Sequence, residues 1–464
     1  MESQTSHIPE IILNGPALQP PPGVVPDFEH PWNLNSVGLL TNALCLTSTL
    51  LACSIRVYSK LFCSKKIQLE EASIWCSYHI ISTSGTFTHQ WNIRLRDLNS
   101  TLYPMSAPAL SNPNMKAMIV KEPYGVVFSV ASWNSPYILG MRSTILPIAA
   151  GNTVVLKGSE LSPRCFSAIA SVLLKAGLPA GVLNYISTDR GRAHDVTEAI
   201  ISHREVKKLN FTGSIAVGRI VSELAARHLK PVLLELGGQA SAIVWEDADL
   251  DLAVTECVAG SFMYAGQCCM STDKVILHKT IRDEFMQKLI SAIKTEFPSA
   301  DEARLMIQPS GKDKVIALLE DAERKGAVIT SPTLEGKCTT SLDHDPTRLE
   351  PRILSGVTPD MNIYQQENFG PTLSIFEVDT EEEALRLAND AECGLSSAVF
   401  TQDLLRGFRL AEEIEAGAVH VNNMSIHDES ALPHGGCKAS GFGRFNTEHG
   451  LSEWLRTKTI TWKK

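Results

Sequence analysis

Two patterns of apolar and polar residues divide the chain at about residue 113. After that point, short apolar runs alternate with stretches in which apolar residues recur every three or four positions. Runs of the first kind predict buried strands, and stretches of the second kind predict amphipathic helices. Their alternation is typical of βαβ units with a parallel sheet. The body of the chain is therefore expected to fold as an α/β protein.

The clearest elements lie in the first hundred residues of this body. Residues 116–132 predict a strand, a turn at residues 123–125 and a second strand. Residues 162–179 predict a helix, because apolar residues are helically spaced and Gly177 and Pro179 signal its end. The other expected elements are strands at 152–160, 181–187 and 206–213 and a helix at 196–203.

The first 112 residues have a different character. The first 30 contain no Lys or Arg and are rich in Pro, which predicts an extended tail over 1–35. Residues 31–55 contain no charged residue and are followed by Arg56, Lys60, Lys65 and Lys66. An apolar stretch of about 20 residues can span a bilayer, with basic residues on its cytosolic side. We therefore expect a candidate transmembrane helix at 36–57 and a junction at 58–112.

A buried soluble helix is the alternative reading of 36–57, because its Ser, Thr and Asn residues weaken it as a membrane span. The stretch also resembles the first helix of fungal rhodopsin-like integral membrane proteins. That resemblance implies a membrane-protein fragment joined to an unrelated enzyme.

Composition and charge exclude several classes of protein. The chain has 464 residues, 44% apolar and 20% charged, which is ordinary for two or three globular domains. It contains 42 Lys and Arg residues and 51 Asp and Glu residues. No run of basic residues indicates nucleic-acid binding. The 11 cysteines include no C-x-x-C pair, which argues against a disulfide framework and a zinc site. We therefore expect no metal and a cytoplasmic setting for the body.

A glycine-rich turn is the first candidate for binding. Gly213, Ser214 and Gly218 lie where a strand ends and a helix begins. Glycines there let the backbone approach a nucleotide phosphate at the helix N-terminus, where N–H groups are free. The spacing G-x-x-x-x-G differs from the dinucleotide fingerprint G-x-G-x-x-G, so a plain strand-to-helix turn stays open as the alternative.

A cysteine pair and an embedded glutamate are the candidates for chemistry. Cys268 and Cys269 follow Gly266 between small and polar residues, which suits an exposed thiol; a buried apolar pair is the alternative. Glu235 lies within the apolar run PVLLEL, where burial would raise its pKa toward neutrality and suit a general base. A solvent-facing glutamate on an edge strand is the alternative. The isolated histidines are interpreted as structural; they are His203, His228, His344 and His434.

Seven ordered motifs resemble the NAD(P)-dependent aldehyde dehydrogenase superfamily. They are EPYGVVFSVASWNSP, AAGNTVVLKGSELSP, FTGSIAVGR, LELGGQA, GQCCMST, QENFGPTLSIFEV and LPHGGCKASGFGR. The versions KGSELSPR, CMSTDK and HGGCKASGFGRF are most similar to the salicylaldehyde, or aromatic aldehyde, branch.

The resemblance implies an α/β fold with two main domains. A Rossmann-type cofactor domain is expected at 113–237, an α/β catalytic domain at 238–440 and a return to the cofactor domain at 441–464. A small oligomerisation β-element would combine a hairpin near 114–126 with a C-terminal strand. The part of the cofactor domain that family members carry at their N-terminus would be missing.

By motif position, the resemblance also implies the site. Cys269 would be the nucleophile, Glu235 the base and Asn134 the amide that stabilises an oxyanion. The implied reaction oxidises an aldehyde, expected to be aromatic, to the acid through a thiohemiacetal and a thioester. The cofactor NAD would be held by Lys157, Glu160, Gly213, Ser214, Gly218, Glu367 and Phe369. The partners expected are a small aldehyde and further copies of the chain, as a dimer or tetramer.

Two other functions stay open at this stage. One is an inactive, membrane-tethered remnant whose cofactor domain cannot pack. The other is a thiol esterase that uses Cys269 without NAD. Retention of Lys157, Glu160 and Glu367 favours dinucleotide binding over the esterase.

Overall fold

The computed structural model describes residues 112, 114–298, 305–332 and 345–463. The tail expected at 1–35, the candidate transmembrane helix at 36–57 and the junction at 58–112, except residue 112, lie outside these residues. Among the helices of the described part, none has the length and apolar character needed to cross a membrane.

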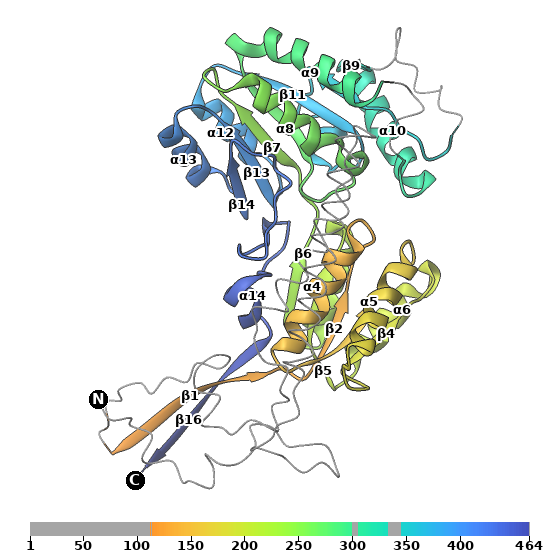
Figure 1. Ribbon diagram of the computed structural model, residues 1–464, viewed down its shortest axis with the longest axis vertical. Helices are drawn as coiled ribbons and strands as arrows, with labels where there is room; N and C mark the ends of the chain where they lie inside the picture. The colour runs from red at the N-terminus through yellow and green to blue at the C-terminus, as the bar shows by residue number, and fades with distance from the viewer. Residues whose placement is uncertain (1–111, 113, 299–304, 333–344, 464) are drawn as a thin grey trace, which may run out of the picture.

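A five-stranded parallel sheet forms the lower body in Figure 1, with strand order β4-β3-β2-β5-β6. Helices connect its strands, so the predicted βαβ units are confirmed. Its strands are β2 (Val126–Val130), β3 (Thr153–Lys157), β4 (Leu183–Ile186), β5 (Val206–Thr212) and β6 (Val232–Glu235). Its helices are α4 (Pro136–Ala149), α5 (Pro163–Lys175), η4 (Arg190–Arg192), α6 (Ala193–Ser202) and α7 (Ile215–Arg227).

A seven-stranded sheet forms the upper body, with strand order β14-β13-β7-β8-β11-β10-β9. Its strand pairs are parallel except β9 with β10. The strands are β7 (Ala240–Val244), β8 (Thr272–His278), β9 (Val328–Thr330), β10 (Arg352–Ser355), β11 (Thr372–Val378), β13 (Ser396–Phe400) and β14 (Ala418–Val421). The helices are α8 (Leu250–Phe262), η5 (Met263–Gly266), η6 (Lys279–Ile281), α9 (Arg282–Glu296), α10 (Pro309–Arg324), α11 (Asn362–Gln365), α12 (Glu381–Asn389) and α13 (Leu404–Glu413).

The central strands of the upper sheet are apolar on both faces. All five residues of β7 and of β13 are buried, as expected for a sheet covered by helices on both sides. Two separate apolar clusters fill the two faces. A rigid sheet of this kind fixes the loops at its strand ends.

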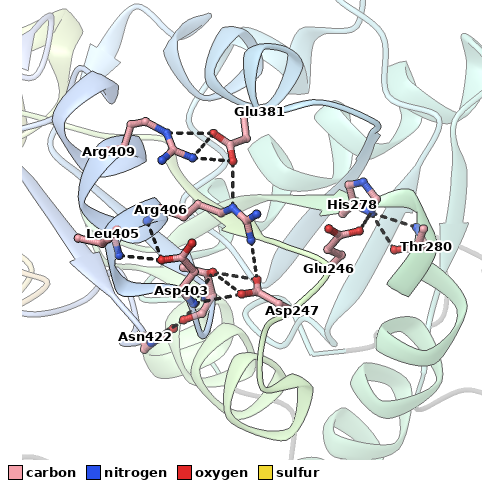
Figure 2. Close-up of polar contacts among 11 residues, drawn as sticks. Glu246, Asp247, His278, Thr280, Glu381, Asp403, Leu405, Arg406, Arg409 and Asn422 are labelled. Atoms are coloured by element: carbon pink, nitrogen blue, oxygen red, sulfur yellow. Dashed lines mark hydrogen bonds and ion pairs between the residues drawn. The ribbon is translucent and has the colours of Figure 1, made fainter.

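Ion pairs fix α13 to the upper sheet (Figure 2). The Arg406 guanidinium lies 3.2 Å from Oδ1 of Asp247 and 3.0 Å from Oε1 of Glu381. Asp403 caps α13 by accepting the N–H groups of Leu405 and Arg406. These half-exposed contacts contribute about 0–1 kcal/mol per ion pair, so they orient the helix more than they stabilise the fold.

A long two-stranded ribbon replaces the expected hairpin near 114–126. β1 (Met115–Pro123) pairs antiparallel with β16 (Leu455–Lys463) at the other end of the chain. A hairpin between β1 and β2 is wrong, because β2 already lies between β3 and β5 and has no free edge. The ribbon projects from the lower body in Figure 1.

The C-terminal segment packs against the lower sheet before it enters the ribbon. Phe445, Trp454 and Leu455 are buried in the same cluster as Val127 and Leu139. This segment includes α14 (Thr447–Ser452), and β15 (Cys437–Lys438) pairs with β12 (Cys393–Gly394).

The same segment covers the edge of β6. The N–H of Leu234 donates to the carbonyl of Phe442, and that of Leu236 donates to the carbonyl of Ser440. Glu235 lies between these two residues and is therefore closed off from solvent although β6 is the last strand of its sheet.

Candidate active site

The structure brings Asn134, Glu235 and Cys269 together from three separate segments. Asn134 lies between β2 and α4, Glu235 ends β6, and Cys269 lies between η5 and β8. The Sγ of Cys269 is 3.9 Å from Oε1 of Glu235. The Nδ2 of Asn134 donates to the carbonyl of Gln267, two residues before Cys269, at 3.2 Å. A thiol, a carboxylate and an amide donor thus meet at one point.

The turn before the cysteines has an unusual backbone. Tyr264, Ala265 and Gly266 have φ values of 53°, 57° and 67°, in the left-handed region. A Cβ on Gly266 would lie 2.2 Å from the carbonyl oxygen of Gly370, so only glycine fits. The side chain of Gln267 holds the turn by hydrogen bonds to three backbone groups. The surroundings therefore fix a strained turn next to the thiol.

Both cysteines are half-buried, so the alternative of a fully buried apolar pair is wrong. The hydrogen bond to Cys268, burial and the carboxylates of Glu235 and Glu367 together raise the pKa of Cys269 well above its usual value. Cys269 is therefore a thiol at neutral pH and needs a base. Glu235 is within reach to accept its proton.

Glu235 is 1% exposed, so the alternative of a solvent-facing side chain is wrong. Burial alone would raise its pKa, as expected from the sequence, but Arg142 and His434 lower it to about 2. The Nη1 of Arg142 lies 3.3 Å from Oε2, and the Nε2 of His434 lies 3.1 Å from Oε1. The prediction of a pKa near neutrality is wrong because the electrostatic and hydrogen-bond contributions of Arg142 and His434 outweigh desolvation.

Neither partner was predicted. His434 was interpreted as structural, yet it lies in the last motif, LPHGGCKASGFGR. Arg142 is the one charged residue of helix α4, which is mostly apolar. A buried arginine in an apolar helix needs a carboxylate partner, and this was the available signal.

Residues expected to bind the cofactor follow the carboxyl ends of parallel strands in the lower sheet. Lys157 ends β3, and Gly213 and Ser214 follow β5. Burial lowers the pKa of Lys157, whereas the charge of Glu160 opposes this shift, so these two side chains are neighbours. Ligands of open parallel sheets bind at this edge.

Ser214 and Gly218 form the first turn of α7. Ser214 is the N-cap, and its hydroxyl accepts the N–H of Val217 at 3.4 Å. A Cβ on Gly218 would lie 2.5 Å from the side chain of Leu236. Gly218 therefore lets α7 approach the segment that follows Glu235.

Glu367 lies on the other side of the same segment. Its Oε1 accepts the N–H of Gly238 at 3.1 Å, and burial raises its pKa to about 7. A Cβ on Gly237 would lie 2.4 Å from its Oε2. Phe369 has a φ of 54° and meets the ring of Trp133 edge-on at 5.8 Å.

These surroundings fit a dinucleotide. The buried hydroxyl of Ser162, at the N-cap of α5 near Lys157 and Glu160, has no hydrogen-bond partner among the described residues. The N-terminus of α7 lies at the same edge of the lower sheet, and helix N-termini bind pyrophosphates through their first N–H groups. Glu367 provides a buried carboxylate at the other end of the candidate cofactor site, away from Lys157 and Glu160.

The chain belongs to the aldehyde dehydrogenase family, because the model of that family matches residues 86–460. The match begins within the stretch 58–112, so it reaches further toward the N-terminus than the motifs indicated. The expected family, α/β fold and class of enzyme, an NAD-dependent aldehyde dehydrogenase, are confirmed. NAD is the cofactor of this class, in agreement with the fit above.

Named relatives and solved structures support this assignment. Vanillin dehydrogenase from Pseudomonas fluorescens is 41% identical over 355 residues, which cover 75% of this chain and 72% of the relative. Salicylaldehyde dehydrogenase from Pseudomonas putida is 36% identical over 406 residues, which cover 85% of this chain and 80% of the relative. The crystal structure of a salicylaldehyde dehydrogenase from Pseudomonas putida G7, complexed with salicylaldehyde, superposes with a TM-score of 0.75 at 34% identity. It covers 84% of this chain and 78% of that one.

A betaine aldehyde dehydrogenase from Staphylococcus aureus in complex with NAD⁺ has a TM-score of 0.74 at 28% identity. The superposition covers 84% of this chain and 74% of that one.

Proposed function

We propose that this enzyme oxidises an aromatic aldehyde to its acid with Cys269 as nucleophile, Glu235 as base and Asn134 as oxyanion donor. The observation that carries the proposal is the convergence of these three groups, with Sγ of Cys269 3.9 Å from Oε1 of Glu235. The carboxylate accepts the thiol proton, and the thiolate forms a C–S bond to the aldehyde carbon. The resulting oxyanion is stabilised by the Nδ2 of Asn134 and the N–H of Cys269.

The remaining residues bind the cofactor and complete the reaction. Lys157 and Glu160 would hold the adenosine ribose. The turn before α7, with Gly213, Ser214 and Gly218, would hold the pyrophosphate. Glu367 and Phe369 would hold the nicotinamide end. NAD supplies the hydride acceptor. Glu235, after losing its first proton, takes a second proton from the water that attacks the thioester carbon. The C–S bond breaks, and the acid leaves.

Aromatic side chains near the thiol support an aromatic substrate. Trp133 precedes Asn134, and its ring lies 6.5 Å from that of Tyr264, which precedes Gln267 in the nucleophile turn. Aromatic rings pair favourably with one another, beyond the area they bury. The named relatives that oxidise vanillin and salicylaldehyde support the same substrate class.

NADH formation with a series of aldehydes tests this proposal. We expect kcat/KM for benzaldehyde, vanillin or salicylaldehyde to exceed that for propanal by at least about tenfold. Trp133→Ala should reduce this preference, whereas Val172→Ala, an exposed change on α5, should not. A higher kcat/KM for propanal would contradict the aromatic substrate class. Ester hydrolysis without any NAD-dependent oxidation would favour the thiol esterase instead.

The β1–β16 ribbon supports a homo-oligomer, a dimer or a tetramer. In the part of the chain that the structure describes, the ribbon has only two strands, and it exposes Ile460 and Trp462. A second copy would cover these side chains and pair with the strand edges. Light scattering of the intact chain and of Trp462→Glu tests this: we expect the variant to form smaller species, and a monomeric intact chain would contradict it.

The candidate transmembrane helix at 36–57 leads to a separate proposal, a single membrane anchor with the enzyme on the cytosolic side. Its support is the apolar sequence and the basic residues that follow it. Carbonate extraction of membranes tests it with the full chain and a chain that begins at residue 86. Pelleting of the full chain alone would support the anchor. A full chain that stays in the supernatant would contradict it.

A further inference from the structure

Gln267 lies two positions before Cys269 and is 1% exposed. Its side-chain amide bonds to backbone groups on two different segments. The Nε2 donates to the carbonyl of Tyr264 at 3.0 Å and to that of Leu305 at 3.1 Å. The Oε1 accepts the N–H of Ile307 at 2.8 Å. This side chain therefore ties the nucleophile turn to the segment that precedes α10.

The segment that receives the side chain is itself anchored to the upper body. Met306 is buried in one of the two apolar clusters of the seven-stranded sheet, and its N–H donates to the carbonyl of Thr347 at 2.7 Å. Leu305 forms an antiparallel bridge with Arg348. Gln267 is thus fixed to a packed part of the fold, although the neighbouring side chains of Leu305 and Ile307 are exposed.

The backbone of Gln267 contacts the oxyanion donor. Its carbonyl oxygen accepts a hydrogen bond from Nδ2 of Asn134 at 3.2 Å, although the two residues are 133 positions apart. Asn134 is 8% exposed and comes from the loop between β2 and α4 of the lower body. A side-chain amide is planar and carries two N–H groups on its nitrogen, so fixing one of them also fixes the direction of the other.

We propose that Gln267 is a positioning residue for the oxyanion donor: its side chain fixes the nucleophile turn, so that its carbonyl oxygen aims the second N–H of Asn134 at the substrate oxygen. This inference rests on the proposed function. Tyr264 and Ala265 have left-handed φ values of 53° and 57°, which cost free energy and persist only where the surroundings impose them. Without the side chain of Gln267 the turn would relax and move the carbonyl. A displacement of about 1 Å at a reacting site can cost about 10²-fold in rate.

The rate of the first turnover tests the inference. Enzyme saturated with NAD is mixed with benzaldehyde, and the first equivalent of NADH is followed, because the oxyanion forms before the hydride is transferred. Gln267→Met keeps the length of the side chain but loses its three hydrogen bonds. We expect the first turnover to slow by about tenfold to about 10²-fold, with little change in the KM for NAD. An unchanged first turnover would overturn the inference.

Asn152→Leu is the matched control for the lost hydrogen bonds. Asn152 is 2% exposed, its Nδ2 donates to the carbonyls of Pro147 and Trp454, and its Oδ1 accepts the N–H of Gly125. It precedes β3, at the edge of the lower sheet opposite the carboxyl end of β6. This variant should lose a similar free energy of unfolding and keep the first-turnover rate. Equal losses of rate in the two variants would show that stability is the cause and would overturn the inference.

Alkylation distinguishes the oxyanion donor from the position of the thiol. Iodoacetamide forms a C–S bond with Cys269 and releases iodide, so no oxyanion develops in this reaction. Gln267→Met should therefore keep the wild-type rate of alkylation at Cys269, followed by mass spectrometry. A loss of alkylation parallel to the loss of NADH formation would show that the side chain positions the thiol instead of Asn134.

A double-mutant cycle tests whether Gln267 acts through Asn134. Asn134→Ala alone should slow the first turnover by about 10²–10³-fold. In that background Gln267→Met should have little further effect, because the amide that it aims is gone. Two losses that multiply in full would overturn the inference. Failure of the proposed function is distinct, because Asn134→Ala would then keep its first turnover, whatever the effect of Gln267→Met.

Ile307→Pro provides a second test that keeps Gln267. The side chain of Ile307 is 36% exposed, and proline lacks the N–H that Oε1 of Gln267 accepts. Ile307→Ala keeps this N–H and is the control. We expect Ile307→Pro to slow the first turnover by about fivefold relative to Ile307→Ala, the rate equivalent of one neutral hydrogen bond. Equal first turnovers in these two variants would overturn the inference even if Gln267→Met does not fold.

Discussion

The Sγ of Cys269 lies 3.9 Å from Oε1 of Glu235, although Glu235 ends a strand of one sheet, Cys269 precedes a strand of the other, and the two are 34 positions apart. The carboxyl end of β6 and the strained turn before β8 create this contact. Gly238, which follows Glu235 closely in sequence, also approaches the backbone of Cys269, since a Cβ at 238 would lie 2.5 Å from its carbonyl oxygen. The base and the nucleophile are thus held by one tightly packed junction between the five-stranded and the seven-stranded sheet.

This contact distinguishes the two adjacent cysteines. Cys269→Ala should abolish NAD-dependent aldehyde oxidation, because it removes the thiol that faces Glu235. Cys268→Ala should keep most of the activity, because only one thiol can face both aldehyde and nicotinamide. Steady-state NADH formation measures both variants, and equal losses would refute the assignment of the nucleophile.

Glu160 should determine the choice between NAD and NADP. A carboxylate beside the adenosine ribose accepts its hydroxyls and repels a 2′-phosphate. We expect kcat/KM for NAD to exceed that for NADP by at least about tenfold, and Glu160→Gln to narrow the gap. A wild-type enzyme that prefers NADP would contradict this role.

Gly237→Ala should weaken cofactor binding with little effect on the fold. The new methyl group would displace the carboxylate of Glu367, which lies 2.4 Å from that position. Loss of one charged hydrogen bond corresponds to about tenfold or more in the KM for NAD. Gly311→Ala on α10 is the control, because its nearest atom lies 3.4 Å away. Equal KM values for the two variants would argue against a role of Glu367.

Asp273 and Glu367 should make the fold without NAD less stable as pH rises. Burial raises the pKa of Asp273 to about 8, with a further contribution from Glu367, and that of Glu367 to about 7. At pH values between the ordinary carboxyl pKa and these raised pKa values, the folded state therefore binds more protons than the unfolded state. The stabilisation is complete below that range and is lost as pH rises through about 7 and 8, with a slope of up to about 1.4 kcal/mol per pH unit and proton.

Asp273→Asn should flatten this dependence, because an amide does not ionise. Denaturant unfolding at several pH values measures it. The exposed Asp195→Asn is the control and should keep the wild-type slope. If Asp273→Asn loses stability with pH as steeply as the control, the buried carboxylate is not the cause.

Local sequence patterns predicted most strands and helices of the lower sheet from their apolar spacing and their Pro and Gly punctuation, but α4 was not among them. They also predicted that Glu235 is buried. Its ionisation could not be predicted locally, because Arg142 and His434 are 93 and 199 positions away. No local signal joins β1 with β16 either, because they lie at opposite ends of the described chain; only the resemblance implied a C-terminal strand in that β-element.

The central claim is a thioester formed on Cys269 and hydrolysed with the help of Glu235, and Glu235→Gln tests it most directly. The variant is mixed with NAD and benzaldehyde, NADH is followed in time, and the protein is then digested and analysed by mass spectrometry. Hydrolysis without the base should slow by about 10²–10⁴-fold. We therefore predict that NADH formation stops near one equivalent per site, with a benzoyl group on Cys269. Full turnover by the variant, or a benzoyl group on Cys268 instead, would contradict the account.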